Sequence, residues 1–190
     1  MEKYPSELRA QLMEDETSIR TQIPCPGAGH IVTLGFPGLA FDVSGSAYVD
    51  RERMEATLSA AALRTCRILI VLVEQTEVPD VAWTLLHDIA DEGDIRIVHM
   101  PIPDYEAPDA LFAEQWAAIS DDLNEILDAG NTVALSCHYG AGRSGTIAAS
   151  MLMDRGLSVT AAIEAVRAEF AESIESEKQL LWLQQKEQAA

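Results

Sequence analysis

In the segment Leu135-Ser-Cys-His-Tyr-Gly-Ala-Gly-Arg-Ser144, a cysteine stands six positions before an arginine. Residues 131–136 predict a short buried strand, and residues 145–155 predict a helix. The stretch between them is therefore a loop that joins a strand end to a helix start. The first N–H groups of a helix lack partners within the helix, and its dipole favours an anion there. The sequence thus predicts an anion-binding loop that carries a thiol.

Each residue type in the loop has a physical task. Gly140 and Gly142 let the backbone curl so that consecutive N–H groups turn inward, as in an anion-binding nest. The planar guanidinium of Arg143 binds two phosphoryl oxygens at once, which a lysine would not reproduce. Cys137 is surrounded by these donors, so we expect it to attack phosphorus as a thiolate. Ser144 is placed to donate a hydrogen bond to that sulfur.

The remaining loop residues are expected to bind phosphate through their backbones. These residues are His138, Tyr139 and Ala141. The His138 side chain either adds positive charge near the phosphate at mildly acidic pH or simply packs or faces solvent, and both interpretations stay open.

Two other interpretations fit parts of this motif. Cys137 by itself is compatible with a small buried apolar residue at a strand end. The segment Gly140-Ala-Gly-Arg-Ser-Gly145 also fits the G-x-G-x-x-G dinucleotide fingerprint. A nucleotide-binding fold needs a strand next, ending in an acidic residue for the ribose. Residues 157–167 instead predict a second helix, which excludes the dinucleotide interpretation.

The loop resembles the signature of the protein tyrosine phosphatase superfamily, His-Cys-x5-Arg-Ser/Thr, especially its dual-specificity and kinase-associated phosphatase type. Met100-Pro-Ile-Pro-Asp-Tyr-Glu-Ala-Pro-Asp109 resembles the acid-bearing loop of that type, at a separation from the cysteine typical of the family. Gly38 and the segment Glu175-Ser-Glu-Lys-Gln-Leu-Leu-Trp182 are weaker matches. The resemblance covers about residues 30 to 185 and is specific only near 100–104 and 135–146.

The resemblance implies that Asp104 is the general acid. A departing alkoxide or phenoxide must receive a proton, and one carboxylic acid on a mobile loop can supply it and then activate water. Asp104 and Asp109 each follow a proline, so a turn or helix-capping role is the alternative for either. Asp109 is the substitute candidate for the acid.

Two positions depart from the family pattern. The histidine that usually precedes the cysteine is Ser136, so we expect activity to shift to higher pH. The glutamine that positions the hydrolytic water in some relatives falls at Glu175, whose charge repels phosphate if it points inward. Alternatively Glu175 lies outside the site, because Ser176-Glu-Lys-Gln179 is typical of a capping box that starts the last helix.

Length and patterning predict one α/β domain. The chain has 190 residues and is 48% hydrophobic, which suffices for one substantial core. Alternating strands and helices predict a mostly parallel sheet covered by helices on both faces, with the loop at the strand carboxyl ends. We expect a polar N-terminal extension over residues 1–26, with Leu8, Leu12 and Ile19 in a short docking helix, and the catalytic domain over 27–190.

The predicted elements follow apolar periodicity. Strands are expected at residues 30–35, 67–73, 94–100 and 131–136, and helices at 51–63, 81–90 with Gly93 ending it, 112–126, 145–155, 157–167 and from 176 onward. The longest aliphatic run, Ile68–Val73, is too short to span a membrane. The charged start of the chain does not resemble a signal peptide.

Charge and cysteine content narrow the location and the partners. The net charge of −18 argues against nucleic acid and anionic membranes. Three cysteines make no disulfide framework, and a reactive thiol suits a reducing cytoplasm. Cys66 is expected to be buried at a strand start. Cys25 is either a plain loop cysteine or a partner that resolves oxidised Cys137.

The sequence therefore predicts a cytoplasmic, cysteine-dependent phosphatase for phosphoprotein monoesters. Cys137 is the nucleophile, Arg143 and the loop amides bind the phosphoryl group, and Asp104 is acid and then base. No metal or other cofactor is expected. Two alternatives stay open: a phosphatase for inositol phosphates or another small phosphoester, and a phosphate-binding pseudophosphatase suggested by Ser136 and Glu175.

Overall fold

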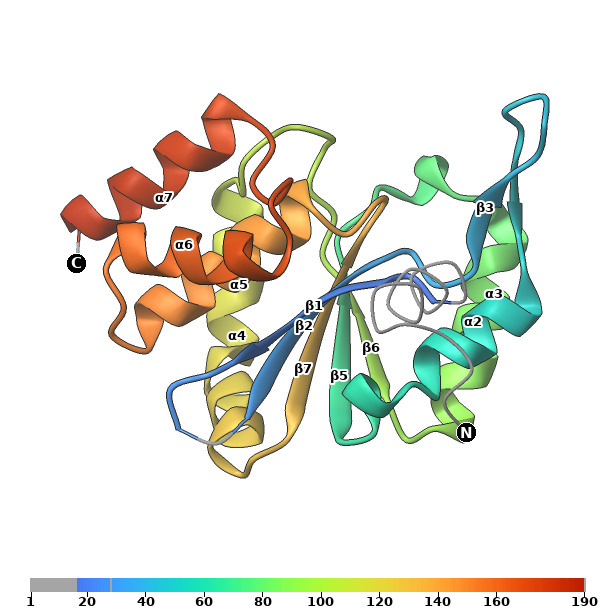
Figure 1. Ribbon diagram of the computed structural model, residues 1–190, viewed down its shortest axis with the longest axis horizontal. Coiled ribbons are helices and arrows are strands. Elements are labelled where there is room, and N and C mark those ends of the chain that lie inside the picture. The colour runs from blue at the N-terminus through green and yellow to red at the C-terminus, as the bar shows by residue number, and fades with distance from the viewer. Residues whose placement is uncertain (1–16, 28, 190) are drawn as a thin grey trace, which may run out of the picture.

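A five-stranded sheet forms the centre of the protein, and the computed structural model describes residues 17–27 and 29–189 (Figure 1). The strands lie in the order β1-β2-β7-β5-β6. Their bounds are Ile19–Pro24 for β1, His30–Gly35 for β2, Cys66–Val71 for β5, Arg96–His99 for β6 and Thr132–Cys137 for β7. β1 runs antiparallel to β2, and the other neighbours are parallel. Cys137 therefore ends the central strand, at the carboxyl edge of the sheet.

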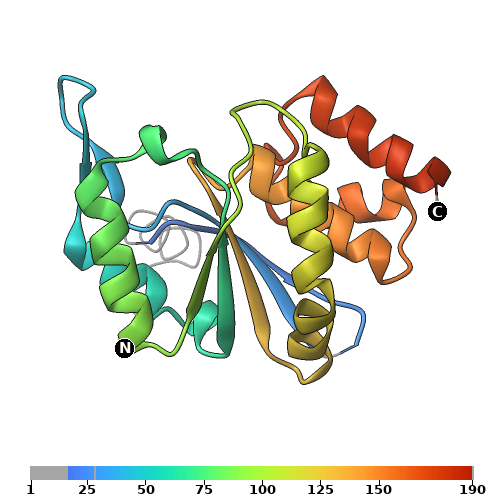
Figure 2. The ribbon, with the colours of Figure 1, turned by 180° about the vertical axis from the view of Figure 1, so that it is seen from behind.

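Helices cover both faces of this sheet (Figures 1 and 2). On one face lie α2 (Arg51–Leu58) and α3 (Asp80–Glu92). On the other lie α4 (Ala110–Asp128), α5 (Gly142–Asp154), α6 (Val159–Glu169) and α7 (Glu177–Ala189). Short 3-10 turns η1 (Ala61–Leu63) and η2 (Gln75–Glu77) and a hairpin of β3 (Leu39–Phe41) and β4 (Ala47–Val49) complete the fold. The predicted α/β class with a mostly parallel sheet is confirmed.

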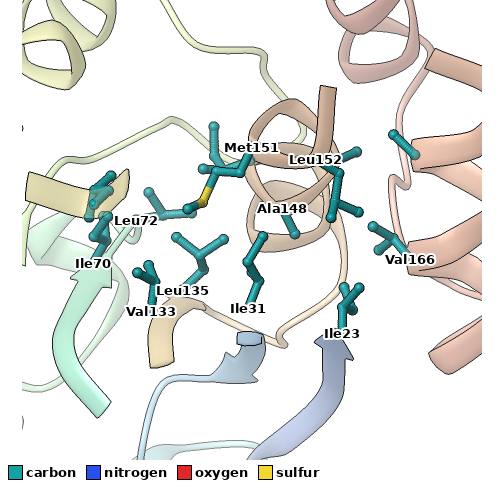
Figure 3. Close-up of a cluster of buried hydrophobic side chains, with 14 of the residues drawn as sticks. Ile23, Ile31, Ile70, Leu72, Val133, Leu135, Ala148, Met151, Leu152 and Val166 are labelled. Atoms are coloured by element: carbon teal, nitrogen blue, oxygen red, sulfur yellow. The ribbon is translucent and has the colours of Figure 1, made fainter. Parts of the chain in front are cut away.

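Two apolar cores lie on the two sides of the sheet. Successive side chains of a strand point to opposite faces, so Val133 and Leu135 enter one core and Ala134 enters the other. Figure 3 shows the first core, where strand residues including Ile31 and Leu135 meet Ala148 and Leu152 of α5. Because the central strands are buried on both faces, they read as continuous apolar runs in the sequence. This packing fixes α5 against the end of β7.

The N-terminal part of the sheet differs from the sequence prediction. Ile19 lies in β1 and not in a docking helix, and β1 pairs with β2 from Ile19 opposite Leu34 to Pro24 opposite His30. The strand thus lies before the predicted boundary between residues 26 and 27. Only the alternate residues Thr21 and Ile23 of β1 are buried, so its apolar pattern is weak, as on many edge strands. The expectations for Leu8 and Leu12 lie outside the described residues.

Helix boundaries show two further differences. α2 ends at Leu58 and not at residue 63, and the separate turn η1 follows it. At the helix end the Ser59 hydroxyl donates to the Glu55 carbonyl at 2.6 Å. α5 begins at Gly142 and not at Gly145, so Arg143 stands in its first turn. The second difference places the guanidinium at the helix start. Among the described residues, no helix is long and apolar enough to cross a membrane.

Candidate active site

The loop between β7 and α5 is folded tightly against the neighbouring strand. Gly140 has a φ of +97°, and a Cβ there would lie 2.5 Å from the Gly35 backbone nitrogen. Only glycine combines that backbone conformation with that close approach. As predicted, the loop lies at the carboxyl ends of parallel strands, where α/β folds commonly bind ligands.

Cys137 is the buried end of β7 and faces hydrogen-bond donors. The residue is only 2% exposed. The Gly140 backbone N–H donates to the sulfur at 3.2 Å, and the Ser144 hydroxyl lies 3.4 Å from it. Both contacts stabilise negative charge on sulfur when the hydroxyl donates. The geometry brings Cys137 and Ser144 together, as their spacing predicted.

Arg143 is buried and held by a carboxylate that the sequence reasoning missed. Its Nη1 and Nη2 donate to Glu77 Oε1 and Oε2 at 2.6 and 2.7 Å, and Nη1 also donates to the Ile102 carbonyl at 3.0 Å. Burial by itself would lower the pKa of Arg143, but Glu77 and the nearby Cys137 and Asp104 outweigh burial and raise it. The guanidinium is thus kept charged and in a fixed plane.

Glu77 reaches Arg143 from η2, just beyond the end of β5. Its Oε1 also accepts the Glu74 backbone N–H at 2.6 Å, which closes a capping box over the turn. Burial would raise the pKa of Glu77, but the Arg143 hydrogen bonds outweigh burial and lower it. One signal in the sequence could have found this residue: a carboxylate shortly after a strand that neighbours the cysteine strand.

Asp104 lies on the loop after β6, at the same edge of the sheet. Its Oδ1 is 3.2 Å from Arg143 Nη2 and accepts the Tyr105 backbone N–H at 3.1 Å. The Asp104 side chain is 56% exposed, so it can reach a bound substrate. Asp109 instead caps α4 by accepting the Phe112 backbone N–H at 2.8 Å. The structure therefore brings Asp104 to the site and gives Asp109 the capping role.

His138 and Tyr139 turn their side chains toward neighbouring aromatic and basic residues. The His138 ring lies 5.7 Å from the Phe41 ring of β3. The Tyr139 ring carries the Arg20 guanidinium at 4.6 Å, a cation–π contact that joins the loop to β1. Ala141 is fully buried. These contacts fix the loop from outside and leave its backbone N–H groups as the candidate phosphate donors.

Ser136 occupies the position where relatives usually carry histidine. The residue has no exposed surface, and its hydroxyl finds no hydrogen-bond partner within the described part of the chain. The site therefore lacks that support for the Cys137 thiolate.

The capping box predicted after Glu175 is present, but Glu175 does not lie outside the site. Gln179 N–H donates to the Ser176 hydroxyl at 3.1 Å and Ser176 N–H donates to Gln179 Oε1 at 3.2 Å, which confirms the capping box. Yet the Glu175 carboxylate still reaches the active-site loop, since a Cβ on Gly142 would collide with its Oε2. Gln179 Nε2 would lie 3.3 Å from the same Cβ. Gln179 is thus a second residue beside the loop that the sequence reasoning missed.

The other two cysteines lie at the opposite edge of the sheet. Cys66 pairs with Thr132 in the sheet, five residues before Cys137, which is about 16 Å along a strand. Cys25 follows Pro24, which pairs with His30 at that same edge. In this fold Cys25 therefore cannot reach Cys137 to resolve an oxidised sulfur. Cys66 is buried, as expected, and burial raises its pKa to about 11.

Two other features bear on the chemistry. In residues 17–27 and 29–189 no group of three or more potential metal ligands is gathered. The segment after α5 forms the helix α6 and no strand, as the argument against a dinucleotide site required.

The fold and the loop together define the class of dual-specificity and tyrosine phosphatases with a cysteine in the phosphate loop. Residues 48–157, more than half of the chain, match the family described as "Polymorphic toxin system, DSP-PTPase phosphatase". The chain therefore belongs to this family. No curated protein matches the chain significantly.

Solved structures of this class have the same fold. The active form of Tk-PTP is 25% identical, with a TM-score of 0.63, and the match covers 91% of this chain and 98% of that one. Kinase-associated phosphatase (KAP) with its catalytic cysteine replaced by serine is 20% identical, with a TM-score of 0.70 and coverage of 90% and 96%. Human DUSP28 is 16% identical, with a TM-score of 0.56 and coverage of 84% and 88%. The predicted dual-specificity resemblance is confirmed.

Proposed function

We propose that the protein hydrolyses phosphate monoesters of phosphorylated proteins, phosphotyrosine first among them and phosphoserine or phosphothreonine in addition, through a cysteinyl-phosphate intermediate. The observation that carries the proposal is the placement of Cys137 and Arg143 at one tightly folded loop. The sulfur accepts the Gly140 N–H at 3.2 Å, and the guanidinium is fixed in its first helical turn. A nucleophile and a phosphate clamp thus share one anion-binding cradle.

The first chemical step forms a sulfur–phosphorus bond. The Cys137 thiolate attacks phosphorus, the bond from phosphorus to the leaving oxygen breaks, and Asp104 gives its proton to that oxygen. In the second step Asp104 takes a proton from water, the water oxygen bonds to phosphorus, and the phosphorus–sulfur bond breaks. Ser144 donates to the departing thiolate from its place near the sulfur. Inorganic phosphate leaves, and Asp104 is protonated again.

Most N–H donors of Arg143 already have partners within the protein, and this limits which of them can bind the substrate. Both Nη atoms contact Glu77, Nη1 also donates to Ile102, and Nη2 also contacts Asp104. These hydrogen bonds and ion pairs of Arg143 with the described residues all use its Nη atoms. A phosphoryl group would therefore take the Nε–H together with the Nη2–H that Asp104 holds in the resting site. Asp104 would release Nη2 as it turns to the leaving oxygen.

A protein substrate is favoured over inositol phosphates by the residues around the loop. Aromatic side chains stand exposed near it, Tyr139 in the loop itself, Tyr105 after Asp104 and Phe41 against His138. Such rings can flank a phosphotyrosine ring. PTPMT1, solved in complex with PI(5)P, shares the fold at 15% identity, which says nothing about this chain's substrate. The reactive Cys137 must stay reduced, which favours a cytoplasmic location.

A turnover panel tests this proposal. Purified protein is offered phosphotyrosine, phosphoserine and phosphothreonine peptides, soluble inositol phosphates and phosphoinositide vesicles, and released phosphate is measured. The proposal predicts the highest kcat/KM on phosphopeptides. Faster hydrolysis of an inositol phosphate would show that inositol phosphates, and not phosphoproteins, are the substrate class. Phosphate binding without any turnover would indicate a pseudophosphatase.

A further inference from the structure

The segment Ser173–Glu175 is bound directly onto the active-site loop. The Ile174 N–H donates to the Ala141 carbonyl at 3.3 Å. From α6, Arg167 donates to the Ser173 and Ile174 carbonyls at 3.0 and 3.1 Å. A segment held by the loop on one side and by an arginine on the other has little freedom to move.

The backbone at this segment is also strained. Ile174 has a φ of +62°, a conformation that β-branched residues rarely adopt and that costs free energy. Beyond it, the buried Gln179 accepts the N–H groups of Glu175 and Ser176 at 3.0 and 3.2 Å. Contacts on both sides of Ile174 thus hold an unfavourable conformation in place. Such strain is a common feature of functional sites.

The result of this arrangement is that Glu175 points at the phosphate cradle. Its carboxylate lies against Gly142 and interacts with the Gly142 backbone N–H. Gly142 is one of the loop residues whose N–H groups we assign to the phosphoryl group. In the resting structure a carboxylate of the protein itself therefore lies where part of the substrate's charge would bind.

Partial burial of the carboxylate and the charges around it disfavour the ionised form of Glu175, although the residue as a whole is exposed. Burial is the largest cause that raises the pKa of Glu175, and the Asp104 and Glu172 carboxylates raise it further. The Gly142 N–H and the Arg143 guanidinium act in the opposite direction without reversing the shift. Lys178, three residues on, is paired with Glu106. A bound phosphoryl dianion would add one more repulsive charge.

We propose that Glu175 is a charge gate on the phosphate site: ionised, it occupies the Gly142 N–H, and the site binds a phosphoryl dianion only once Glu175 has taken up a proton from solvent. The proton returns to solvent when the anion leaves and the carboxylate contacts Gly142 again. The inference rests on the proposed function for the identity of this loop as the phosphate site. It adds a residue that sets the affinity of the site for anions.

Binding of an anion of constant charge measures the gate without catalysis. Sulfate is suitable because it remains a dianion from about pH 5 to about pH 8. All proteins carry Cys137→Ser, so that the thiol does not contribute to the pH dependence. The parent is compared by calorimetry with the same protein carrying Glu175→Gln, which keeps the shape of the side chain without its charge. The matched control carries Glu177→Gln, which removes an exposed carboxylate in the first turn of α7.

The gate predicts a difference in slope between these proteins. Sulfate affinity of the parent and of the Glu177→Gln control should fall by about tenfold or more from about pH 5 to about pH 8, because one proton is bound with the anion. With Glu175→Gln the fall should be less than about threefold, and affinity at the upper pH should exceed that of the parent. In two buffers of different ionisation enthalpy, the parent should take up a proton on binding and the Glu175→Gln protein should not.

Three results would overturn the gate. An unchanged slope with Glu175→Gln would assign the pH dependence to other groups, and absence of sulfate binding at any pH would remove the anion site itself. A Glu175→Gln enzyme with intact Cys137 that loses kcat but keeps its KM would place Glu175 in the chemical step. A wild type that hydrolyses no phosphate monoester would refute the proposed function alone, because the sulfate measurement needs no turnover.

Discussion

Glu77 and Arg143 form a two-point ion pair across the carboxyl edge of the sheet. Nη1 of Arg143 donates to Oε1 of Glu77 at 2.6 Å, and Nη2 donates to Oε2 at 2.7 Å. Arg143 is 2% exposed, so the pair is largely withdrawn from water. A fork-to-fork pair of this kind fixes the plane of the guanidinium as well as its position. Phosphate binding by Arg143 therefore depends on a residue outside the loop motif.

Replacing Glu77 tests that dependence. Glu77→Ala leaves a buried guanidinium without its carboxylate, which should cost about 3 kcal/mol of unfolding free energy and lower kcat/KM about tenfold or more. Denaturant unfolding and aryl phosphate kinetics measure the two effects. Gln75→Ala, in the same turn but exposed, is the control and should change neither. Near-normal stability and kinetics in Glu77→Ala would show that Arg143 is positioned without Glu77.

The same ion pair predicts a pH dependence of stability. The pKa of Glu77 is lower in the folded protein than its ordinary value. Its contribution is therefore fully present above the unfolded-state pKa and is lost as the pH falls through the lower folded-state value. The difference in unfolding free energy between wild type and Glu77→Gln should be constant near neutrality and shrink in acid.

Arg143→Lys should impair both binding and rate. A single ammonium cannot pair with both Glu77 oxygens and also span two phosphoryl oxygens. We expect a rise in the inhibition constant of vanadate together with a loss of kcat on an aryl phosphate. Kinetics close to wild type would contradict the assignment of Arg143 as the phosphate clamp.

Substitutions of Asp104 and Asp109 should differ in how the rate of hydrolysis depends on the leaving group. Asp104→Asn should slow hydrolysis of phosphotyrosine peptides by about a hundredfold, because the phenolate then leaves without a proton, and should affect activated aryl phosphates less. Asp109→Asn keeps a residue that can cap α4 and should change little. A series of aryl phosphates with increasingly acidic leaving groups measures the dependence. A selective loss in Asp109→Asn would move the acid to that residue.

Ser136→Ala tests the buried hydroxyl before the nucleophile. That hydroxyl has no hydrogen-bond partner in the part of the chain that the structure describes, so its removal should leave the unfolding free energy unchanged or slightly increased. Denaturant midpoints of wild type and variant give the comparison. A loss of about 1 kcal/mol or more would mean that the hydroxyl is satisfied in solution.

The features predicted well are those encoded by neighbouring residues. β2 was predicted at residues 30–35 and observed there, because its apolar run is buried on both faces. The anion-binding loop after β7 could be predicted because its glycines permit a tightly curled backbone and because the motif runs into a helix. The approach of Ser144 to Cys137 also followed, because both residues belong to one local motif.

The features that were missed depend on contacts between distant segments. Glu77 meets Arg143 across 66 positions of sequence, and its place shortly after a strand is the one signal in the sequence for that pairing. β1 has only alternate buried residues, and β3 and β4 are three residues each, too short for periodicity to show. The direction of the Glu175 side chain depends on the positive φ at Ile174. β-Branched residues rarely adopt a positive φ, so the sequence gives no reason to expect it.

Catalysis through Cys137 is tested by identifying the covalent intermediate. Wild-type protein turning over an aryl phosphate is quenched in acid, digested and analysed by mass spectrometry. We expect a phosphoryl group on the sulfur of Cys137, and Cys137→Ser should retain less than about one percent of turnover while still binding vanadate. A phosphoryl group on another residue, or substantial turnover by Cys137→Ser, would show that Cys137 is not the nucleophile.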